Sequence, residues 1–254
     1  MEVDDMRVLH APQNIGGMAG MLAKAQRELG VDAQAYSFSN SVFQYASDYG
    51  LSCRGTLARQ VQALWFAAKF SLTFDVFHFY FGESLLGPSL ADVPWLRRLG
   101  KKVFFHFCGC DIRDSKKTVA RYESSACKEC WPMLCSANRK EAQRMAYEQA
   151  DSIFVSTPDL LEFVESARLL PQPINLEQFD RVRSGLSAST LARRRDGVRI
   201  VHAPTNRQIK GTEYLEKAVR QLNAEGLDIE LVLVERRPYG EALQIYNDAD
   251  LGVD

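Results

Sequence analysis

The chain has 254 residues, of which 46% are hydrophobic and 25% charged, as in a typical globular protein. A formal net charge of -1 argues against a general nucleic-acid binder, which would need a strongly basic surface. The acidic N-terminus has neither the basic nor the apolar part of a signal peptide, and the most apolar window contains Lys69 and Asp75, so we expect no leader and no membrane span. We therefore predict a cytoplasmic protein whose six cysteines are free thiols.

Apolar and amphipathic segments alternate along the first 175 residues. Short runs rich in aliphatic and aromatic residues indicate buried strands; they cover residues 7–12, 31–37, 74–81, 101–109 and 151–157. Apolar residues at a spacing near 3.6 indicate helices; they cover residues 16–30, 56–71, 89–100, 138–150 and 158–164. This alternation predicts an α/β fold with a mostly parallel sheet covered on both faces.

The alternation restarts after a polar, basic segment. Residues 176–197 are rich in Ser and Arg and indicate a linker. The second half then predicts strands at 198–204, 228–235 and 250–254, with helices at 212–226 and 239–249. We therefore predict one domain over residues 1–175 and the start of a second over 198–254. The second is shorter than the ~100–150 residues of a usual domain, so we expect it to be incomplete.

One phrase opens both predicted domains. Residues 7–17 read RVLHAPQNIGG and residues 199–211 read RIVHAPTNRQIKG. Each begins with the first predicted strand of its half and ends at a glycine. Ligands of open α/β sheets lie beyond the carboxyl ends of the strands, so both phrases are candidate ligand loops.

The first loop, NIGGMAG, is rich in glycine. Gly16 and Gly17 follow the strand and precede the helix. Glycine there allows a ligand to approach the backbone and the N–H groups of the helix N-terminus. The alternative is a tight turn without a ligand, and the position of the loop favours the binding role.

The second loop differs by its cations. Arg207, Lys210 and Gly211 stand immediately before the predicted helix at 212–226. Positive charge at a helix N-terminus is unfavourable unless an anion lies between the two, so this arrangement favours a diphosphate site. The alternative is a pair of solvated surface charges.

A cysteine-rich insertion covers residues 108–135. Cys127 and Cys130 have the spacing of a zinc knuckle, and Cys110 and Cys135 could complete a structural site of four thiolates. Buried free thiols and, in an oxidising compartment, a disulfide are the alternatives. A second basic feature, the Arg-rich run at 191–197, is a solvated linker face or a contact with an anionic membrane surface.

Several segments in order resemble a known family, the GT-B glycosyltransferases, and within it glycosyltransferase family 4. The similar segments are NIGGMAG, FDVFHFYFG, CGCDIR, ADSIFVSTPDLLEFV, LPQPINLEQF and the phrase at 199–211. The resemblance implies two Rossmann-like domains with parallel sheets, the second incomplete in this chain. It also implies transfer of a sugar from a nucleotide-diphosphate donor to a glycan or lipid-linked acceptor, with retention at the anomeric carbon, in glycan or polysaccharide biosynthesis.

The family's pattern assigns roles to particular residues. Arg207 and Lys210 match the Arg and Lys that hold the donor diphosphate, and Gly16 and Gly17 would face the same cleft. Fixed cations and N–H groups stabilise the charge of the leaving nucleoside diphosphate, so no metal or cofactor is required for catalysis. The expected location is the cytoplasm, with contact at the inner membrane face.

Two departures from the family concern catalysis. Cys108 replaces the family's histidine and cannot copy imidazole proton chemistry, so His106, His78 and Asp111 become the candidate catalytic residues. A structural role as core residues is the alternative for the two histidines, and an acceptor-side loop role is expected of Asp111 and Arg113.

The second departure is that the family's E-x7-E segment would fall after residue 254, so we expect a C-terminally truncated relative. Two rival functions follow: a catalytically inactive relative that serves as a binding or partner subunit, and another sugar-nucleotide enzyme of the same fold, such as an epimerase.

Overall fold

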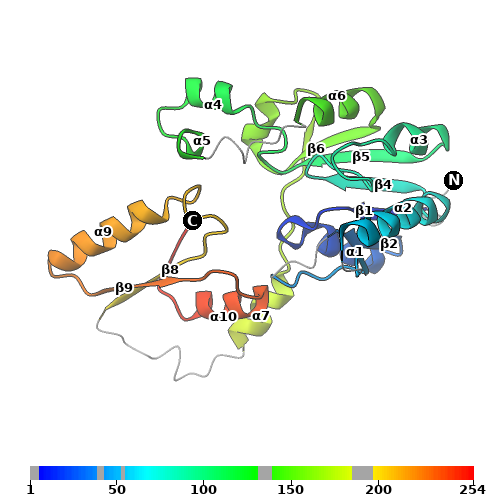
Figure 1. Ribbon diagram of the computed structural model, residues 1–254. Helices are drawn as coiled ribbons and strands as arrows, with labels where there is room; N and C mark the ends of the chain where they lie inside the picture. The colour runs from blue at the N-terminus through cyan, green and yellow to red at the C-terminus, as the bar shows by residue number, and fades with distance from the viewer. Residues whose placement is uncertain (1–5, 39–42, 53–54, 131–138, 185–196) are drawn as a thin grey trace. The chain divides into compact units, whose positions relative to one another are not determined.

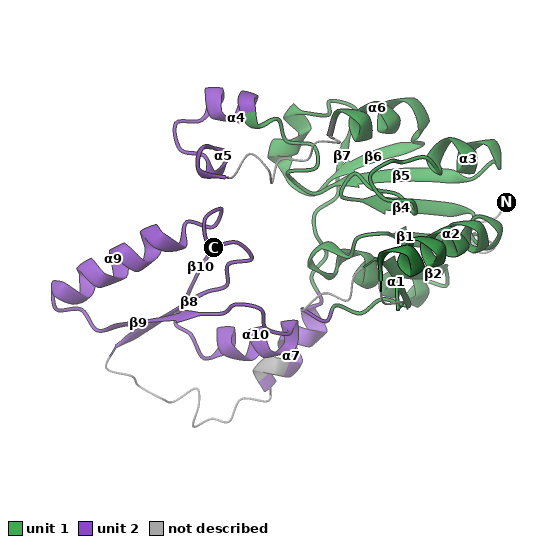
Figure 2. Cartoon of the chain, viewed as in Figure 1, with its two compact units in different colours: residues 1–41, 45–115, 133–174 green, residues 42–44, 116–132, 175–254 purple. Residues whose placement is uncertain are grey.

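The structure, a computed structural model, describes residues 6–38, 43–52, 55–130, 139–184 and 197–254. The chain forms two compact units (Figure 2). Unit 1 comprises residues 1–41, 45–115 and 133–174, and unit 2 comprises residues 42–44, 116–132 and 175–254. Each unit contains its own parallel sheet, which confirms the predicted α/β class.

Unit 1 is built on a seven-stranded parallel sheet of order β3-β2-β1-β4-β5-β6-β7 (Figure 1). Its strands are β1 Arg7–Ala11, β2 Asp32–Ser37, β3 Tyr49–Gly50, β4 Val76–Tyr80, β5 Lys102–Phe107, β6 Ser152–Val155 and β7 Arg168–Leu169. Its helices are η2 Ile15–Gly17, α1 Met18–Glu28, α2 Thr56–Thr73, α3 Val93–Arg98, α6 Arg139–Gln149 and η4 Pro158–Glu162. The helix predicted at 158–164 is thus a short 3-10 helix that begins at a proline.

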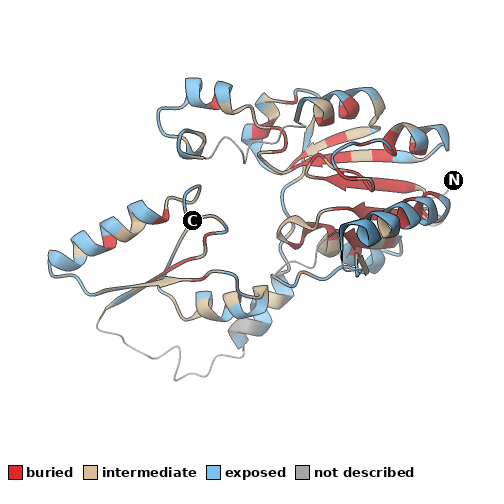
Figure 3. Ribbon diagram, in the orientation of Figure 1, coloured by how far each residue is buried: buried red, intermediate tan, exposed pale blue. Residues whose placement is uncertain are grey.

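The two faces of this sheet differ in chemistry because side chains alternate along each strand. Phe77, Phe79 and Phe105 belong to the larger core, which also contains buried residues of α2, α3 and α6. Val8 and Val76 belong to the smaller core with the alanines of α1. Buried residues concentrate on the central strands of unit 1 (Figure 3). Full burial of each phenylalanine contributes roughly 1.5–3 kcal/mol, so the aromatic face dominates the stability of the unit.

Unit 2 contains a three-stranded parallel sheet of order β10-β8-β9. Its strands are β8 Val198–His202, β9 Ile229–Leu233 and β10 Leu251–Val253, and its helices are α4 Ser115–Arg121, α5 Ala126–Glu129, α7 Leu176–Ser184, α9 Thr212–Ala224 and α10 Tyr239–Asn247.

Two boundaries differ from the sequence prediction. Helix α7 occupies the first part of the predicted linker and packs on α10, whereas residues 185–196, including most of the Arg-rich run, lie outside the described residues. Residues 116–132, predicted as part of the N-terminal domain, cluster with unit 2. Among the helices that the structure describes, none combines the length and apolarity needed to cross a lipid bilayer.

Candidate functional site

The loop between β8 and α9 in unit 2 contains the predicted diphosphate residues. Asn206 organises it: its side-chain Oδ1 accepts hydrogen bonds from the backbone N–H groups of Gln208 (3.0 Å) and Ile209 (3.1 Å). The N–H of Lys210 donates to the Asn206 carbonyl at 3.0 Å. Gly211 then adopts a left-handed conformation with φ of 63° and precedes α9 without a side-chain cap. Polar N–H groups at such a helix start attract anions.

Both predicted cations of this loop are held by carboxylates. Arg207 forms a two-point contact with Glu235, with N···O distances of 2.6 and 2.9 Å, and Glu216 lies 3.4 Å away. Lys210 Nζ lies 2.7 Å from a carboxylate oxygen of Asp254. The hydrogen bond from Arg207 lowers the pKa of Glu235 below its ordinary value. Spacing along the sequence could not reveal Glu235 and Asp254 as partners, because these residues follow the ends of β9 and β10.

A buried histidine at the start of this loop connects β8 with α9 and with β10. His202, at the end of β8, is fully buried, and its Nδ1 lies 2.8 Å from the carbonyl of Val253 in β10. A carbonyl only accepts, so Nδ1 carries the proton and Nε2 accepts from the hydroxyl of Thr212, 2.9 Å away. The histidine therefore fixes the start of α9 to two strands.

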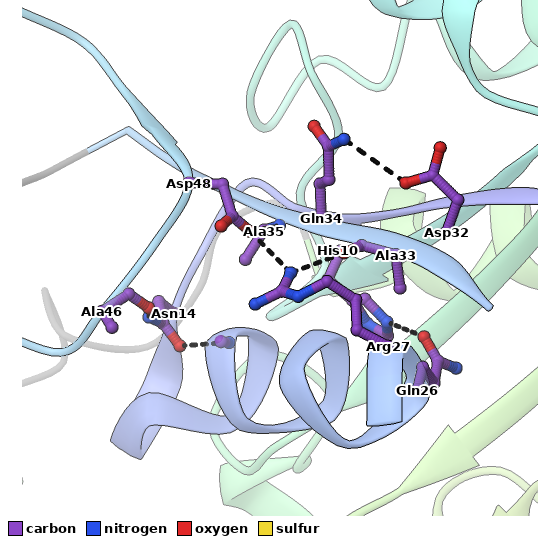
Figure 4. Close-up of polar contacts among 11 residues, drawn as sticks. His10, Asn14, Gln26, Arg27, Asp32, Ala33, Gln34, Ala35, Ala46 and Asp48 are labelled. Atoms are coloured by element: carbon purple, nitrogen blue, oxygen red, sulfur yellow. Dashed lines mark hydrogen bonds and ion pairs between the residues drawn. The ribbon is translucent and has the colours of Figure 1, made fainter. Parts of the chain in front are cut away.

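The matching histidine of unit 1 does the same. His10 is fully buried in β1, and its Nε2 donates to Gln26 Oε1 of α1 at 2.7 Å (Figure 4). Its Nδ1 then accepts from the hydroxyl of Tyr80 in β4, 2.8 Å away. The repeated His-Ala-Pro phrase thus places one histidine in the first strand of each unit. In both units this histidine links its own strand to a neighbouring strand and to the helix that follows.

The glycine loop of unit 1 is filled by the chain itself. Gly16 has a φ of 56°, and a Cβ atom there would lie 2.0 Å from Gln172 Nε2, which donates to the Gly16 carbonyl at 3.0 Å. Gly17 has a φ of 81°, and its Cβ would lie 2.9 Å from the ring of Tyr45. Close approach of unit 1's own residues therefore accounts for both glycines, and their predicted role toward a donor stays a prediction.

Asn14 anchors this loop from the side. Its Oδ1 accepts from the N–H of Gly20 at 3.3 Å, and its Nδ2 donates to the carbonyl of Ala46 at 2.9 Å (Figure 4). A Cβ at Gly20 would lie 2.2 Å from that same carbonyl oxygen. The third glycine of the loop is thus required by the contact between α1 and the segment that follows β2.

The candidate catalytic histidines form a cluster inside unit 1. His78 pairs with His10 across β4 and β1, and Tyr80 pairs with His106 across β4 and β5, so all four rings lie on the α1 face of the sheet. The ring centroids of His10 and His78 are 5.1 Å apart, and those of His78 and His106 are 5.4 Å apart.

Burial determines the protonation of this cluster. It lowers the pKa of His10 and of His106 to about 4, and it holds the pKa of His78 well below its ordinary value. Neither ring nitrogen of His106, nor Nε2 of His78, has a hydrogen-bonding partner within the part of the chain that the structure describes. The three imidazoles are therefore neutral at pH 7, and their catalytic assignment stays a prediction.

Asp111 closes the turn after β5. Its carboxylate accepts from the backbone N–H of Cys108 at 3.0 Å and of Gly109 at 2.6 Å, and the residue is 1% exposed. Burial raises its pKa to about 6 and raises the pKa of the Cys108 thiol to about 12. Arg113 pairs with Asp159 at 2.6 Å.

The predicted zinc ligands are divided between the units. Cys110 belongs to unit 1, whereas Cys127 and Cys130 belong to unit 2, and Cys135 lies outside the described residues. Among the residues that are described, no group of three or more His, Cys, Asp or Glu side chains has an arrangement suited to a metal ion. The zinc site therefore stays a prediction.

Comparison with solved structures identifies similar folds. The catalytic domain of starch synthase IV from Arabidopsis thaliana, bound to ADP and acarbose, matches with a TM-score of 0.59 and 11% identity, over 97% of this chain and 77% of that one. A UDP-N-acetylglucosamine 2-epimerase from Rickettsia bellii matches with a TM-score of 0.51 and 11% identity, over 94% and 71%. A putative enzyme of the same name from Listeria monocytogenes matches with a TM-score of 0.55 and 12% identity, over 97% and 73%.

The chain has a GT-B-like fold. This confirms the predicted fold class of two parallel-sheet, Rossmann-like parts. No protein-family model matches the chain, and no curated protein is significantly similar to it. At these identities the likeness concerns the fold, so the activity is argued from the site.

Proposed function

We propose that the chain is a GT-B glycosyltransferase that takes its sugar from a nucleotide-diphosphate donor. The observation that carries the proposal is the loop before α9, where Arg207, Lys210 and the uncapped helix start gather beyond the carboxyl end of β8. This is where an open α/β sheet binds its ligand, and cations at the start of a helix are suited to phosphate oxygens. The similar structures bound to ADP or named for a UDP-sugar are consistent with a nucleotide ligand.

The same groups would promote the reaction. Negative charge develops on the leaving nucleoside diphosphate as the glycosidic bond breaks, and preorganised cations stabilise that charge without a metal. Arg207 and Lys210 must first exchange Glu235 and Asp254 for phosphate oxygens, so donor binding has an electrostatic cost as well as a gain. We assign retention at the anomeric carbon, in keeping with the resemblance.

Unit 1 would hold the acceptor, a glycan or a lipid-linked glycan of polysaccharide biosynthesis, at the cytoplasmic side of the membrane. Asp111 is the acceptor-side residue we favour for proton transfer, because a pKa of about 6 suits an acid or base near neutral pH. His78 and His106 are secondary candidates, since burial lowers their pKa values away from the range that suits an acid or base near neutral pH. The cysteines of the insertion are proposed to bind structural zinc.

Calorimetric titration with ADP, UDP and GDP, followed by the corresponding sugars, tests the donor site. Loss of charge-assisted hydrogen bonds predicts that Arg207→Ala weakens the affinity about 10- to 100-fold, and Lys210→Ala does so by a similar factor. Lys217→Ala is the matched control, because it removes a cation from α9, the helix that follows the loop, at a site paired with Glu213. Affinity for all three nucleotides that is unchanged in Arg207→Ala would contradict the diphosphate site.

An epimerase is the second candidate function. It is favoured by one specific observation, namely that two of the similar folds carry the name UDP-N-acetylglucosamine 2-epimerase. Incubation with UDP-N-acetylglucosamine, without an acceptor, separates the two: an epimerase converts the sugar configuration, which proton NMR detects. A retaining glycosyltransferase does not change the sugar configuration, and it consumes the nucleotide sugar only when an acceptor is added. An inactive relative would bind nucleotide and do neither.

A further inference from the structure

The cysteine-rich insertion contacts the loop that precedes α9. Residues 116–132 of the insertion belong to the same compact unit as residues 175–254 (Figure 2). Within that unit the hydroxyl of Tyr214, in the first turn of α9, donates to a carboxylate oxygen of Glu129 in α5 at 2.6 Å. The two residues are 85 positions apart in the sequence. The insertion therefore reaches the candidate donor loop through α5.

A cavity of about 590 Å³ lies between α5 and this loop. Its lining comes from two segments, residues 123–129 of the insertion and residues 208–214 at the start of α9. Small-molecule sites typically have volumes of roughly 300–1,000 Å³. Lys210 and Gly211 line the cavity and also belong to the candidate diphosphate loop. The cavity thus adjoins the position proposed for the phosphates.

The lining of the cavity combines hydrogen-bond donors with acceptors. Glu123 and Glu129 supply carboxylate oxygens, and Lys128 and Lys210 supply ammonium groups. A phosphate offers only acceptors and is repelled by two carboxylates, whereas each hydroxyl of a sugar both donates and accepts. The ring of Tyr214, whose residue is 59% exposed, adds apolar area beside these polar groups. The cavity therefore suits a polyhydroxylated group better than a phosphate.

We propose that residues 123–129 of the insertion recognise the sugar of the nucleotide-sugar donor in this cavity, an assignment that rests on the proposed function. The sugar of such a donor is bonded directly to the terminal phosphate, so it lies next to the groups that hold the diphosphate. Glu129 accepts from sugar hydroxyls with the lone pairs that Tyr214 leaves unused, and the ring of Tyr214 packs against the C–H groups of the sugar. The insertion then determines which sugar is accepted, because a site built to bind a hydroxyl rejects a sugar that lacks it.

Calorimetric titration with matched pairs of ligands tests this assignment. Each pair is a nucleoside diphosphate and its sugar conjugate: UDP with UDP-glucose and UDP-N-acetylglucosamine, ADP with ADP-glucose, and GDP with GDP-mannose. Glu129→Gln keeps an oxygen for the Tyr214 hydroxyl but loses the charge and half of the accepting oxygens. For the nucleotide sugar that the wild type binds most tightly, we expect this variant to weaken the affinity at least about five-fold, while the affinity for the matching nucleoside diphosphate stays within about two-fold.

Two further variants complete the comparison. Tyr214→Ala removes the ring and is expected to weaken sugar-nucleotide binding in the same selective way. Glu213→Gln is the matched control, because it makes the same change one residue before Tyr214, at a carboxylate that pairs with Lys217. Successive helical residues point about 100° apart, and we expect this variant to bind both members of each pair like the wild type. Glu129 and Tyr214 are exposed, so the variants should fold, which thermal melts check.

The difference between the two members of a pair decides the outcome. Equal losses for both members in Glu129→Gln would overturn the assignment, because the cavity would then hold the ribose or the contact would be structural. Unchanged affinity for both members would overturn it as well. Neither result concerns the diphosphate site, which is contradicted by unchanged nucleoside-diphosphate affinity in Arg207→Ala. A wild-type chain that binds no nucleotide would overturn the proposed function, and the sugar assignment with it.

Discussion

Acid should destabilise unit 1 through its buried histidine cluster. His10, His78 and His106 stack on one face of the sheet with ring centroids 5.1 and 5.4 Å apart, and burial lowers the pKa of His10 and His106 from 6.5 to about 4. Protonation of any one ring would place a cation beside two further imidazoles in the interior of the unit. The perturbation is a shift from pH 7 to pH 4.5, applied to the wild type and to His106→Leu.

The sign and size of the effect follow from proton linkage. Between pH 6.5 and 4 the histidines bind protons in the unfolded chain but not in the folded cluster. The free energy of unfolding therefore falls as the pH falls through this range, and it has its full value above pH 6.5. The two pKa values of each histidine differ by about 2.5, which corresponds to about 3 kcal/mol per histidine. The free energy of unfolding of a domain is roughly 5–15 kcal/mol, so the protonation of two such histidines would remove much of the stability of unit 1.

Buried Asp111 acts in the opposite direction. Its pKa is raised to about 6, so it takes up a proton in the folded state first and offsets about 3 kcal/mol of the loss on acidification. The difference between wild type and His106→Leu isolates the histidine, because Asp111 is present in both. Urea unfolding followed by circular dichroism at pH 7 and at pH 4.5 measures that difference.

His106→Leu should be as stable as the wild type at pH 7, or more stable by about 1 kcal/mol, because it removes buried ring nitrogens without partners. Between pH 7 and 4.5 it should lose about 2–3 kcal/mol less than the wild type. His202→Leu is the contrast, since both of its nitrogens are hydrogen-bonded, and it should lose about 2 kcal/mol already at pH 7. Parallel pH dependence of His106→Leu and wild type would refute the reasoning, because the imidazole would then titrate as if solvated.

Three further predictions concern other contacts. Gly20→Ala should lower the stability of unit 1 by about 2 kcal/mol or more, because its Cβ would lie 2.2 Å from a backbone carbonyl, whereas Gly240→Ala, which meets nothing within 4 Å in α10, should raise stability by about 0.5–1 kcal/mol in thermal melts. Thr212→Val should cost about 1 kcal/mol in urea unfolding, and Thr212→Ser should restore most of it, because the hydroxyl donates to the buried histidine of β8. Glu235→Gln should tighten nucleotide-diphosphate binding about two- to five-fold in calorimetry by releasing Arg207, and unchanged or weaker binding would contradict the exchange of partners described for that cation.

The layout of both units could be predicted because their strands and helices carry local patterns. Val76–Tyr80 was predicted within residues 74–81, and β8 within 198–204, since runs of apolar and β-branched residues bounded by polar ones are a property of neighbouring residues. Parallel pairing also followed from the alternation itself. A helix between two strands returns the chain to the end of the sheet where the first strand began, so the next strand runs in the same direction. Helix α7 was missed for the converse reason: its own composition is polar, and its contact with α10 involves residues distant in the chain.

The repeated His-Ala-Pro phrase and the cation loop before α9 were therefore determined by the sequence alone, as were the parallel α/β class and the position of both loops at strand ends. The tertiary structure decided what these residues touch: His10 and His202 became buried links, Arg207 acquired Glu235, and one face of α2 remained exposed while the other was buried. The physical reason is that hydrogen bonds, ion pairs and burial depend on residues tens of positions away, whose approach is determined by packing and not by any local spacing.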